Sequence, residues 1–512
     1  MSTRELVRQL RAVEAGGPIA RYSTRHTRQM SNPMMVAFVR MAGESRPWGI
    51  VYGRLKEKSP TFLTAPDGRN RLDVSEICEE FGQVMLAYMH AESATFSPMT
   101  KDNADDLELP QIWLPGPRHI EMFHYLEYSF FRVRKGDDRT KPLTVFARLS
   151  GWLFRESSQM GQQMIVDAAA LMKNMYVFPA DNIGISNLTN ANAWFDVGAE
   201  LNDKRLAVRS AGDVRVSPTL DPNIDSKTLS PLVEARGVAL KDGKSTKVFE
   251  DKIREVLVSE LQTRWTALLK SYKILLDDPR PENSGVDFLV HRSKLNFVNE
   301  FQRVERNLQD PDLGPAFTPH PETDFHGSAA ASNYFQMSAA DTAYLATLVH
   351  DDQELLQESL VAGRSFIGEV TQVYDTGVGR TTTPIWRMTV PIADQLRLRE
   401  SERYAPLGEK LHTFLVRSVE IIEDQELLIE GEWIDRKTRE ISGEILAKPA
   451  DLSWTGHKVI FVPKDSSSME LSSSRAVWSA AKGPGAWLTH GRAPAVAAEG
   501  TIDDITQLTG DV

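Results

Sequence analysis

The chain has little cysteine: Cys78 is the only one among 512 residues. A single thiol cannot form a disulfide within the chain or supply a cysteine-rich zinc site, so disulfide scaffolds and classical zinc fingers are excluded. The N-terminus has no apolar stretch of the kind a secretory signal needs, and the longest apolar runs, such as residues 164–172, are too short to span a membrane. We therefore expect a cytoplasmic protein that is not embedded in a membrane.

The sequence also shows no internal repeat of fixed period and no Gly-x-Ser-x-Gly nucleophile elbow. Hydrophobic residues make up 41% and charged residues 25% of the chain, which is typical of a folded globular protein. A chain of this length is expected to form about two to four domains.

Positive charge is concentrated at the front of the chain. The first 60 residues contain 11 Lys and Arg, nine of them Arg, and 4 Asp and Glu, which gives a formal charge of +7. The totals of 59 and 70 leave 48 basic and 66 acidic residues in the remaining 452, a formal charge of −18. This asymmetry indicates a protein that binds a polyanion at one end and repels it elsewhere.

The extended segment after the first helix is the candidate nucleic-acid contact. Its arginines can form two hydrogen bonds with a phosphate, and its aromatic rings can stack on bases. The residues concerned are Arg21, Tyr22, Arg25, His26 and Arg28. The alternative is that this basic segment pairs with an acidic patch of the same protein or of a neighbouring copy.

Apolar periodicity and turn residues predict a mixed, α+β fold. An N-terminal α+β domain, a central helical subdomain and a C-terminal small antiparallel β barrel or sandwich are expected. Helices are predicted at 6–13, 73–88, 120–130, 160–175, 249–275, 294–308 and 338–361. The last of them is expected to be capped by Ser338 and Asp341. Strands are predicted at 35–43, at 48–55 and in six runs after Gly363. The predicted segments are 1–60 (basic helix, arm and first strands), 61–197 (helix-rich α+β domain), 198–247 (linker or surface excursion), 248–363 (helical), 364–464 (β domain) and 465–512 (partly disordered tail).

One segment has the side chains of a metal site. His320, Glu322, Asp324 and His326 alternate, so an extended backbone would direct all four to one side, and imidazoles with carboxylates suit Zn, Mn or Fe. Because the four are so close in sequence and beside two prolines, a solvated loop between helices is the simpler interpretation.

Other catalytic patterns are incomplete. Glu121 and His124 form a Glu-x-x-His pair, but the second helix that a di-iron bundle needs is absent, since Glu409 and His412 run into strand-like sequence. Residues 237–246 resemble a phosphate-binding loop with one residue too many between the glycines.

A carboxylate and lysine set of the kind that nucleases use occurs near the C-terminal strands. Asp424, Asp435 and Lys437 could surround a metal ion and its water, although a charged hairpin loop explains the last two equally simply. Cys78 lies on a core-facing helix and is interpreted as a small hydrophobic residue rather than a nucleophile.

The sequence therefore predicts a non-enzymatic, structural component of a nucleoprotein complex, either a coat- or nucleocapsid-like protein or a scaffolding subunit of a machine that handles nucleic acid. The expected partners are nucleic acid, through backbone contacts, and protein or further copies of the chain, with no cofactor and no membrane. The alternative is a metal-dependent hydrolase or nuclease that uses the residues named above.

Overall fold

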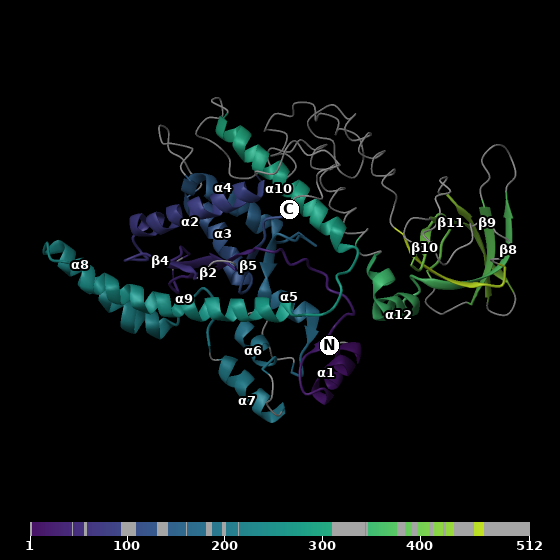
Figure 1. Ribbon diagram of the computed structural model, residues 1–512, viewed down its shortest axis with the longest axis horizontal. Helices are drawn as coiled ribbons and strands as arrows, with labels where there is room; N and C mark the ends of the chain where they lie inside the picture. Colours follow the sequence, from purple (N-terminus) through teal and green to yellow (C-terminus); the bar gives the residue numbers. More distant parts are fainter. Residues whose placement is uncertain are drawn as a thin grey trace, which may run out of the picture. The chain divides into compact units, whose positions relative to one another are not determined.

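In the computed structural model, the chain divides into two units, Met1–Pro319 and His320–Val512, and each is described by itself. The described residues are 3–43, 45–55, 59–93, 109–130, 142–159, 161–180, 187–196, 201–212, 214–309, 344, 347–375, 384–391, 397–408, 413–422, 426–434 and 455–464. Helices and strands are both abundant (Figure 1), so the predicted α+β class is confirmed.

A five-stranded sheet of order β4-β3-β2-β5-β6 lies at the centre of the first unit. Its strands are β2 (Met34–Val39), β3 (Gly49–Arg54), β4 (Thr61–Thr64), β5 (Ile112–Leu114) and β6 (Ile165–Asp167). β2, β5 and β6 run parallel, and β3 is antiparallel to β2 and β4. The strands predicted at 35–43 and 48–55 are confirmed as β2 and β3.

Helices cover both faces of this sheet. α2 (Arg71–Ser93), α3 (Pro117–Phe130) and α4 (Pro142–Glu156) lie on one face, where Phe38 of β2 meets Phe81 and Phe123 edge to face. α9 (Lys247–Leu276) lies on the other face (Figure 1), with Leu261 and Trp265 against the glycines of β3. The helices predicted at 73–88, 120–130 and 249–275 are confirmed, and α10 (Val286–Gln309) contains the one predicted at 294–308.

The helix predicted at 160–175 is only half right. Residues 165–167 form β6, and helix α5 (Ala168–Met175) starts where the Asp167 carboxylate accepts a hydrogen bond from the Ala170 N–H at 2.9 Å. Met164 directly precedes this strand and Met172 and Met175 lie in α5, while Ile165 pairs with Ile112 of β5, so the first part of the predicted helix belongs to the sheet.

Residues 198–247, predicted as a linker or surface excursion, contain regular helices. They are α7 (Leu201–Gly212), the π-helix η1 (Ile224–Leu229) and α8 (Ser230–Lys241). Each of these helices buries few apolar side chains, such as Val208, Leu229 and Ala239, and leaves Leu206, Val238 and Leu240 exposed, so no continuous buried stripe marks them in the sequence. The first unit thus continues through this segment and includes α9 and α10, which were predicted to belong to a separate helical subdomain.

The segment between α7 and η1 is attached to helices α3 and α9 by one buried side chain from each. The His119 Nε2–H donates to the Val216 carbonyl at 2.6 Å, and Arg264 Nε donates to the Ser217 carbonyl at 2.8 Å. Burial lowers the pKa of His119 to about 3, so the ring is neutral and its Nδ1 accepts from the Phe38 N–H at 3.1 Å.

Three short elements complete the first unit: helices α1 (Thr3–Glu14) and α6 (Leu188–Ala193), and a two-strand pair of β1 (Ile19–Ala20) with β7 (Tyr176–Val177). The helix predicted at 6–13 is confirmed as α1.

The second unit contains a closed antiparallel barrel of order β10-β11-β12-β9-β8-β13, which confirms the predicted barrel. Its strands are β8 (Phe366–Asp375), β9 (Pro384–Pro391), β10 (Arg403–Pro406), β11 (Phe414–Ile422), β12 (Glu426–Trp433) and β13 (Lys458–Pro463). Trp386, Phe414, Trp433 and Phe461 fill the interior. The Phe414 ring occupies the space where Gly431 has no side chain.

The helix predicted at 338–361 is interrupted. Asp352 is extended, and its carboxylate accepts from the N–H groups of Glu354 and Leu355, which starts a separate helix α12 (Gln353–Val361). The predicted caps Ser338 and Asp341, the β-rich run at 440–446 and the tail at 465–512 lie outside the described residues.

Candidate functional site

The predicted arm is extended, as expected, and packs along the first unit through its backbone. The Arg21 N–H donates to Met175 O at 2.9 Å, and Arg25 exchanges hydrogen bonds with the backbone of Pro281 and Asn283 at 2.8 and 2.9 Å. The Arg28 N–H donates to the Gln163 side chain at 3.0 Å. The arm is therefore an integral part of this unit.

Two arginines of the arm form ion pairs within the chain. Arg21 makes two hydrogen bonds with the Glu5 carboxylate, at 2.8 and 2.9 Å. Arg28 contacts Glu282 at 2.5 Å and Asp287 at 2.6 Å. These three carboxylates lower the electrostatic attraction that the two arginines can offer to phosphate. Pairing with acids of the same protein was the alternative left open by the sequence.

The other predicted contact residues lie beside these pairs. Tyr22 and His26 meet edge to face, with ring centroids 4.8 Å apart, and Arg280 donates to the Tyr22 carbonyl at 2.8 Å. The Nε of Arg25 is buried. Contact of Arg21, Tyr22, Arg25, His26 and Arg28 with nucleic acid stays a prediction.

The predicted metal and nuclease residues cannot be placed. His320, Glu322, Asp324 and His326, and likewise Asp424, Asp435 and Lys437, lie outside the described residues. Within the described ranges, no three His, Cys, Asp or Glu side chains gather as a metal site would require.

The remaining sequence motifs have structural explanations. His124 is half-exposed on α3, with its Nδ1 3.7 Å from a Glu127 carboxylate oxygen, whereas Glu409 and His412 lie outside the described part of the chain. Gly237 belongs to α8, and Gly243 forms the turn after it with φ +66°. Cys78 is fully buried and burial raises its pKa, as expected for a packed residue rather than a nucleophile.

A hollow of about 500 Å³ lies beside the carboxyl end of β6, at the edge of the sheet. Carboxyl ends of parallel strands are a common location of ligand sites. Asp167, Glu121, Ser157, Ser158, Gln162 and Asn174 supply its main polar lining. The Gln162 amide bonds both the N–H and the C=O of Ile165, at 2.8 and 2.6 Å, which satisfies the outer edge of β6.

Asp167 is the unusual titratable group of this hollow. Burial raises its pKa from about 3.8 to about 6, although the N–H groups of Ala169 and Ala170 act in the opposite direction. The carboxyl can therefore gain or lose a proton near neutral pH, which suits it to bind an amine or exchange a proton. Sequence reasoning missed Asp167; the signal was an aspartate between a branched run and an alanine-rich helix.

Asp167 is expected to make the first unit less stable as pH rises. The folded state keeps the proton between pH 3.8 and about 6, while the unfolded chain releases it, so stability falls across this window and stays lower above it. Asp167→Asn keeps the cap and removes the charge, and should raise stability at neutral pH by about 1–2 kcal/mol. Thermal midpoints measured against pH test this. A variant less stable than wild type at neutral pH would mean that the charged form has a stabilising partner.

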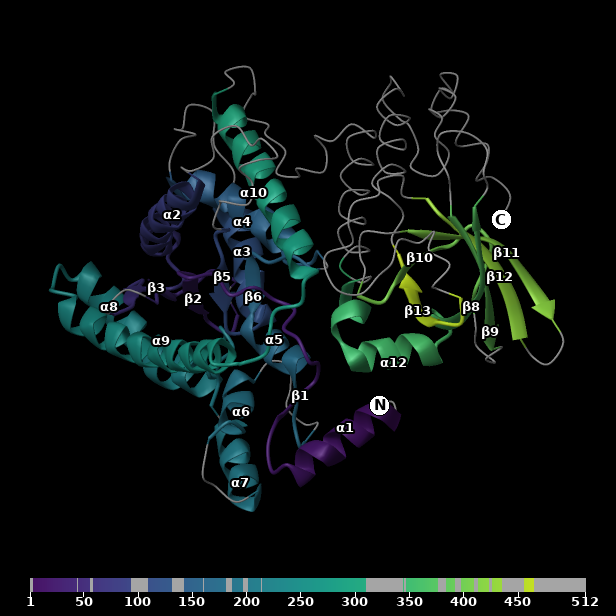
Figure 2. The ribbon, with the colours of Figure 1, turned by 45° about the vertical axis from the view of Figure 1, so that its right-hand side comes forward.

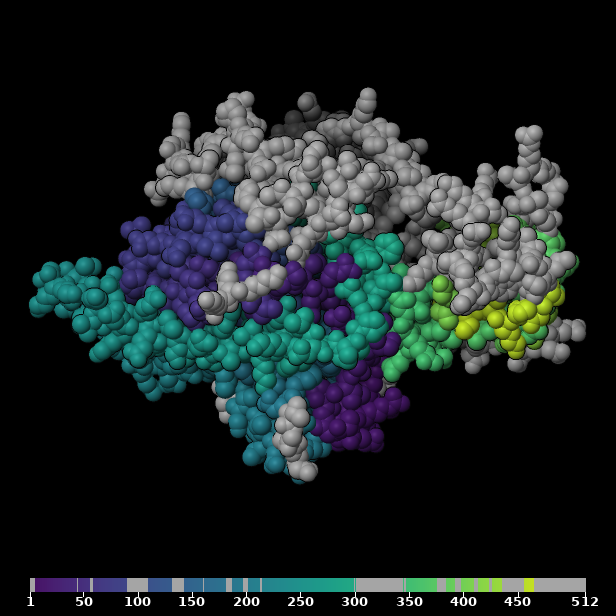
Figure 3. Space-filling model, viewed as in Figure 1, coloured from purple at the N-terminus to yellow at the C-terminus, as the bar shows by residue number. Residues whose placement is uncertain are grey.

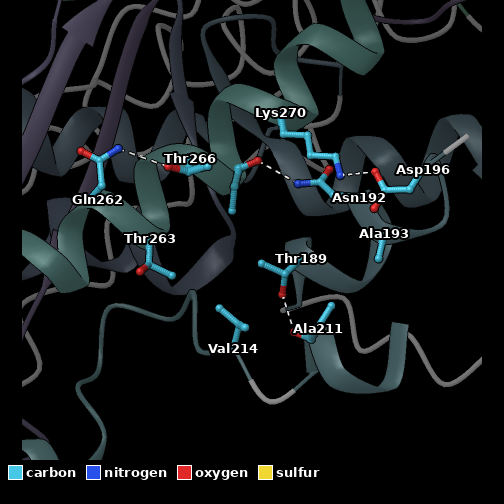
Figure 4. A pocket seen from close by; sticks show the side chains of 11 residues that line it. Thr189, Asn192, Ala193, Asp196, Ala211, Val214, Gln262, Thr263, Thr266 and Lys270 are labelled. Atoms are coloured by element: carbon cyan, nitrogen blue, oxygen red, sulfur yellow. Dashed lines mark hydrogen bonds and ion pairs between the residues drawn. The ribbon is translucent and has the colours of Figure 1, made fainter. Parts of the chain in front are cut away.

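A second hollow, of about 430 Å³, lies between α6, α7 and α9. Figure 4 shows Thr263 of α9 on one side of it and Thr189 of α6 on the other. At one side, Lys270 Nζ pairs with Asp196 at 2.5 Å, and Asn192 donates to the Ala267 carbonyl at 2.8 Å. Its lining is more apolar than polar, with Ala193, Ala211 and Val214 beside a few hydroxyl and amide groups, so it offers no concentrated set of polar contacts to a ligand.

Comparison with known proteins adds no identity to these observations: the chain matches no family model, no curated protein and no solved structure. Among the helices of the described ranges, none combines the length and apolar character needed to cross a bilayer.

Proposed function

We propose that the protein is a non-enzymatic assembly subunit of a nucleoprotein complex. The observation that supports this best is a set of exposed apolar side chains where α8 and α9 meet. Val238, Leu240 and Val248 are 60%, 63% and 61% exposed. We call these three residues the α8–α9 tip. Exposed apolar side chains grouped at one end of a helix pair are a feature of protein interfaces.

The tip extends past the sheet (Figures 1 and 3), whereas the rest of the α9 apolar face is buried on it. Arg236 fixes the helix pair, because it bonds Glu250 of α9 at 2.8 Å and lies 3.5 Å from Asp73 of α2. A preordered surface loses less conformational entropy on binding than a flexible one. The α8–α9 tip is therefore the surface of this unit that we propose as the protein interface.

The nucleic-acid part of the proposal depends on the arm. Arg21 and Arg28 are 16% and 33% exposed at their side chains, so phosphate can reach them only by replacing Glu5, Glu282 or Asp287. Such an exchange predicts weak retention of nucleic acid that is sensitive to salt.

Two measurements on the purified full chain test the proposal: its native mass, and the nucleic acid that purifies with it. The native mass tests the tip. Wild type should have a mass of more than one chain, and Val238→Asp with Val248→Asp should shift it to one chain, since buried carboxylates disrupt an apolar interface. Leu276→Asp, at the exposed other end of α9, is the matched control and should leave the mass unchanged. A wild-type protein with the native mass of a single chain, or a tip variant that still assembles, would contradict the assembly role.

The same preparations test the arm. Glu282→Gln removes one partner of Arg28 and should increase nucleic-acid retention, whereas Arg28→Gln should decrease it. Retention that neither substitution changes would mean that the ion pairs are purely structural, and the nucleic-acid part would then be rejected.

A further inference from the structure

The hollow beside β6 lies where the chain leaves two adjacent parallel strands. β5 and β6 pair side by side, with Leu114 opposite Asp167, and their carboxyl ends lead into α3 and α5 (Figure 2). Residues of α3, of the end of α4, of β6 and of α5 surround the hollow. The space beside the carboxyl ends of neighbouring parallel strands is a common place for a ligand.

Side-chain alternation places the Asp167 carboxyl on the face of the sheet that α3 and α4 cover. Trp113 of β5 points to the opposite face, where its ring meets Tyr272 of α9 with centroids 4.9 Å apart. Its neighbour Leu114 therefore points to the α3 face, and so does Asp167, because registered residues of paired strands share a face. The Asp167 Oδ1 accepts from the Ala170 N–H at 2.9 Å, which holds the carboxyl at the start of α5.

The hollow carries negative charge that no basic side chain balances. Its two charged side chains are Asp167 and Glu121, and the described residues that line it include no Lys, Arg or His. Burial raises the pKa of Asp167 and only backbone N–H groups lower it, so no cation of the described ranges acts on this carboxyl. The basic residues next to the lining in sequence lie outside it: Arg28, Arg118, Arg155 and Lys173. A positive ligand would therefore supply the partner that a partly buried carboxylate needs.

The rest of the lining distinguishes between kinds of cation. Its apolar wall is formed by Ile120, Phe154, Val166 and Leu171. A metal ion such as Mg²⁺ or Ca²⁺ needs oxygen ligands on most sides, and the described residues bring no three His, Cys, Asp or Glu side chains together. An organic ammonium group needs only one or two carboxylates for its N–H donors, and its carbon part needs an apolar surface.

We propose that this hollow binds a small organic molecule that carries a protonated amine and an apolar group. Asp167 and Glu121 accept hydrogen bonds from the ammonium group, and the apolar wall contacts the hydrocarbon part. An anionic ligand is disfavoured, because the Asp167 carboxylate already caps the positive end of α5. The site is separate from the α8–α9 tip and does not depend on the assembly role.

Titration of the full chain with phenethylamine, followed by ligand-observed NMR, tests the site. Phenethylamine and isoamylamine should bind with dissociation constants of about 1 mM, as expected for ligands of so few atoms. Phenethyl alcohol, which has the same shape without the charge, and the anion 3-phenylpropanoate should bind about tenfold more weakly or worse. Asp167→Asn keeps the helix cap and should weaken phenethylamine binding about tenfold, and Glu121→Gln should weaken it less, since Glu121 is exposed. Ala170→Leu fills the hollow, leaves both carboxylates in place and should abolish binding.

Asp352→Asn is the matched control. Asp352 also caps a helix by accepting from two backbone N–H groups, but it does not line the hollow, so its replacement should leave amine binding unchanged. The tip variant Val238→Asp with Val248→Asp should also bind the amine like wild type, so failure of the assembly role would not be confused with failure here. Phenethylamine should raise the thermal midpoint of wild type at neutral pH and not that of Asp167→Asn.

Several outcomes would overturn the proposal. Equal binding of phenethyl alcohol would show that the hollow is only an apolar surface. Phenethylamine binding that survives Asp167→Asn would place the amine elsewhere. Failure of both amines to bind wild type would reject the site, and Mg²⁺ that binds wild type but not Asp167→Asn in their place would identify it as a metal site.

Discussion

Replacing Gln111 by leucine is expected to destabilise the first unit by about 4 kcal/mol or more, because four hydrogen-bonding groups would lose their partner in the interior. The Gln111 side chain is fully buried. Its Oε1 accepts from the Met30 N–H at 3.2 Å and from Trp113 Nε1 at 2.8 Å. Its Nε2 donates to the carbonyls of Arg28 and Gln163, at 2.8 and 2.9 Å.

These four bonds join three segments that are far apart in the sequence. The Gln111 amide, directly before β5, bonds Arg28 and Met30 of the arm. It also bonds the carbonyl of Gln163, which lies two residues before β6. Leucine has a similar volume but neither donates nor accepts, so each freed group is buried without compensation. We therefore expect the arm to detach at residues 28–30 first.

Hydrogen exchange of the Met30 and Arg28 amides, together with the thermal transition of the full chain, measures this effect. Gln262→Leu is the matched control: Gln262 is exposed and its amide makes one bond within α9, to Thr266 at 3.2 Å, so its loss should change stability by less than about 0.5 kcal/mol. Unchanged protection of Met30 in the Gln111→Leu variant would show that the arm is held by other contacts.

The arm illustrates which part of this protein a sequence can predict. Its extended backbone and its excess of arginine are local properties and were predicted. The acids that pair with Arg28 lie 254 and 259 positions further along the chain, and nothing in the local pattern indicates them. Charge counts therefore gave the composition of this segment but not the partners of its side chains.

The same distinction holds for the secondary structure. α2, α3 and α9 bury a continuous stripe and were predicted, because the period of a buried face is visible in the sequence. β5 and β6 have only three residues each, and what makes them strands is their pairing of Ile112 with Ile165. No prediction was made for 142–156, which form α4. Short parallel strands depend on contacts that sequence periodicity does not contain.

The candidate site was predicted less well than the fold. Asp167 stands out only through its burial and its position at the end of β6. The apolar spacing of Leu6 and Leu10 predicted a helix correctly, although these side chains are exposed. Which side of an amphipathic helix faces the core was decided by Arg8 and Glu5, whose contacts are tertiary.

A substitution that should stabilise an ordinary helix is expected to destabilise α4. Gly151 lies inside α4, where alanine is usually favoured over glycine by about 1 kcal/mol. A Cβ at this position would lie 2.0 Å from the Glu127 carboxyl carbon. Glu127 is 6% exposed and pairs with Arg155 at 3.1 Å. Gly151→Ala must displace this carboxylate from its partner, at a net cost of about 2 kcal/mol.

Two further variants identify the cause. Gly237→Ala, inside α8 and with no atom within 4 Å of the added Cβ, should stabilise by about 1 kcal/mol, as helix propensity alone predicts. Combining Gly151→Ala with Glu127→Ala removes the group that would collide, so the double variant should be more stable than the sum of the single effects predicts. Thermal midpoints of the four proteins, including wild type, complete this cycle. Strictly additive effects would show that the glycine is needed for a reason other than the Glu127 carboxylate.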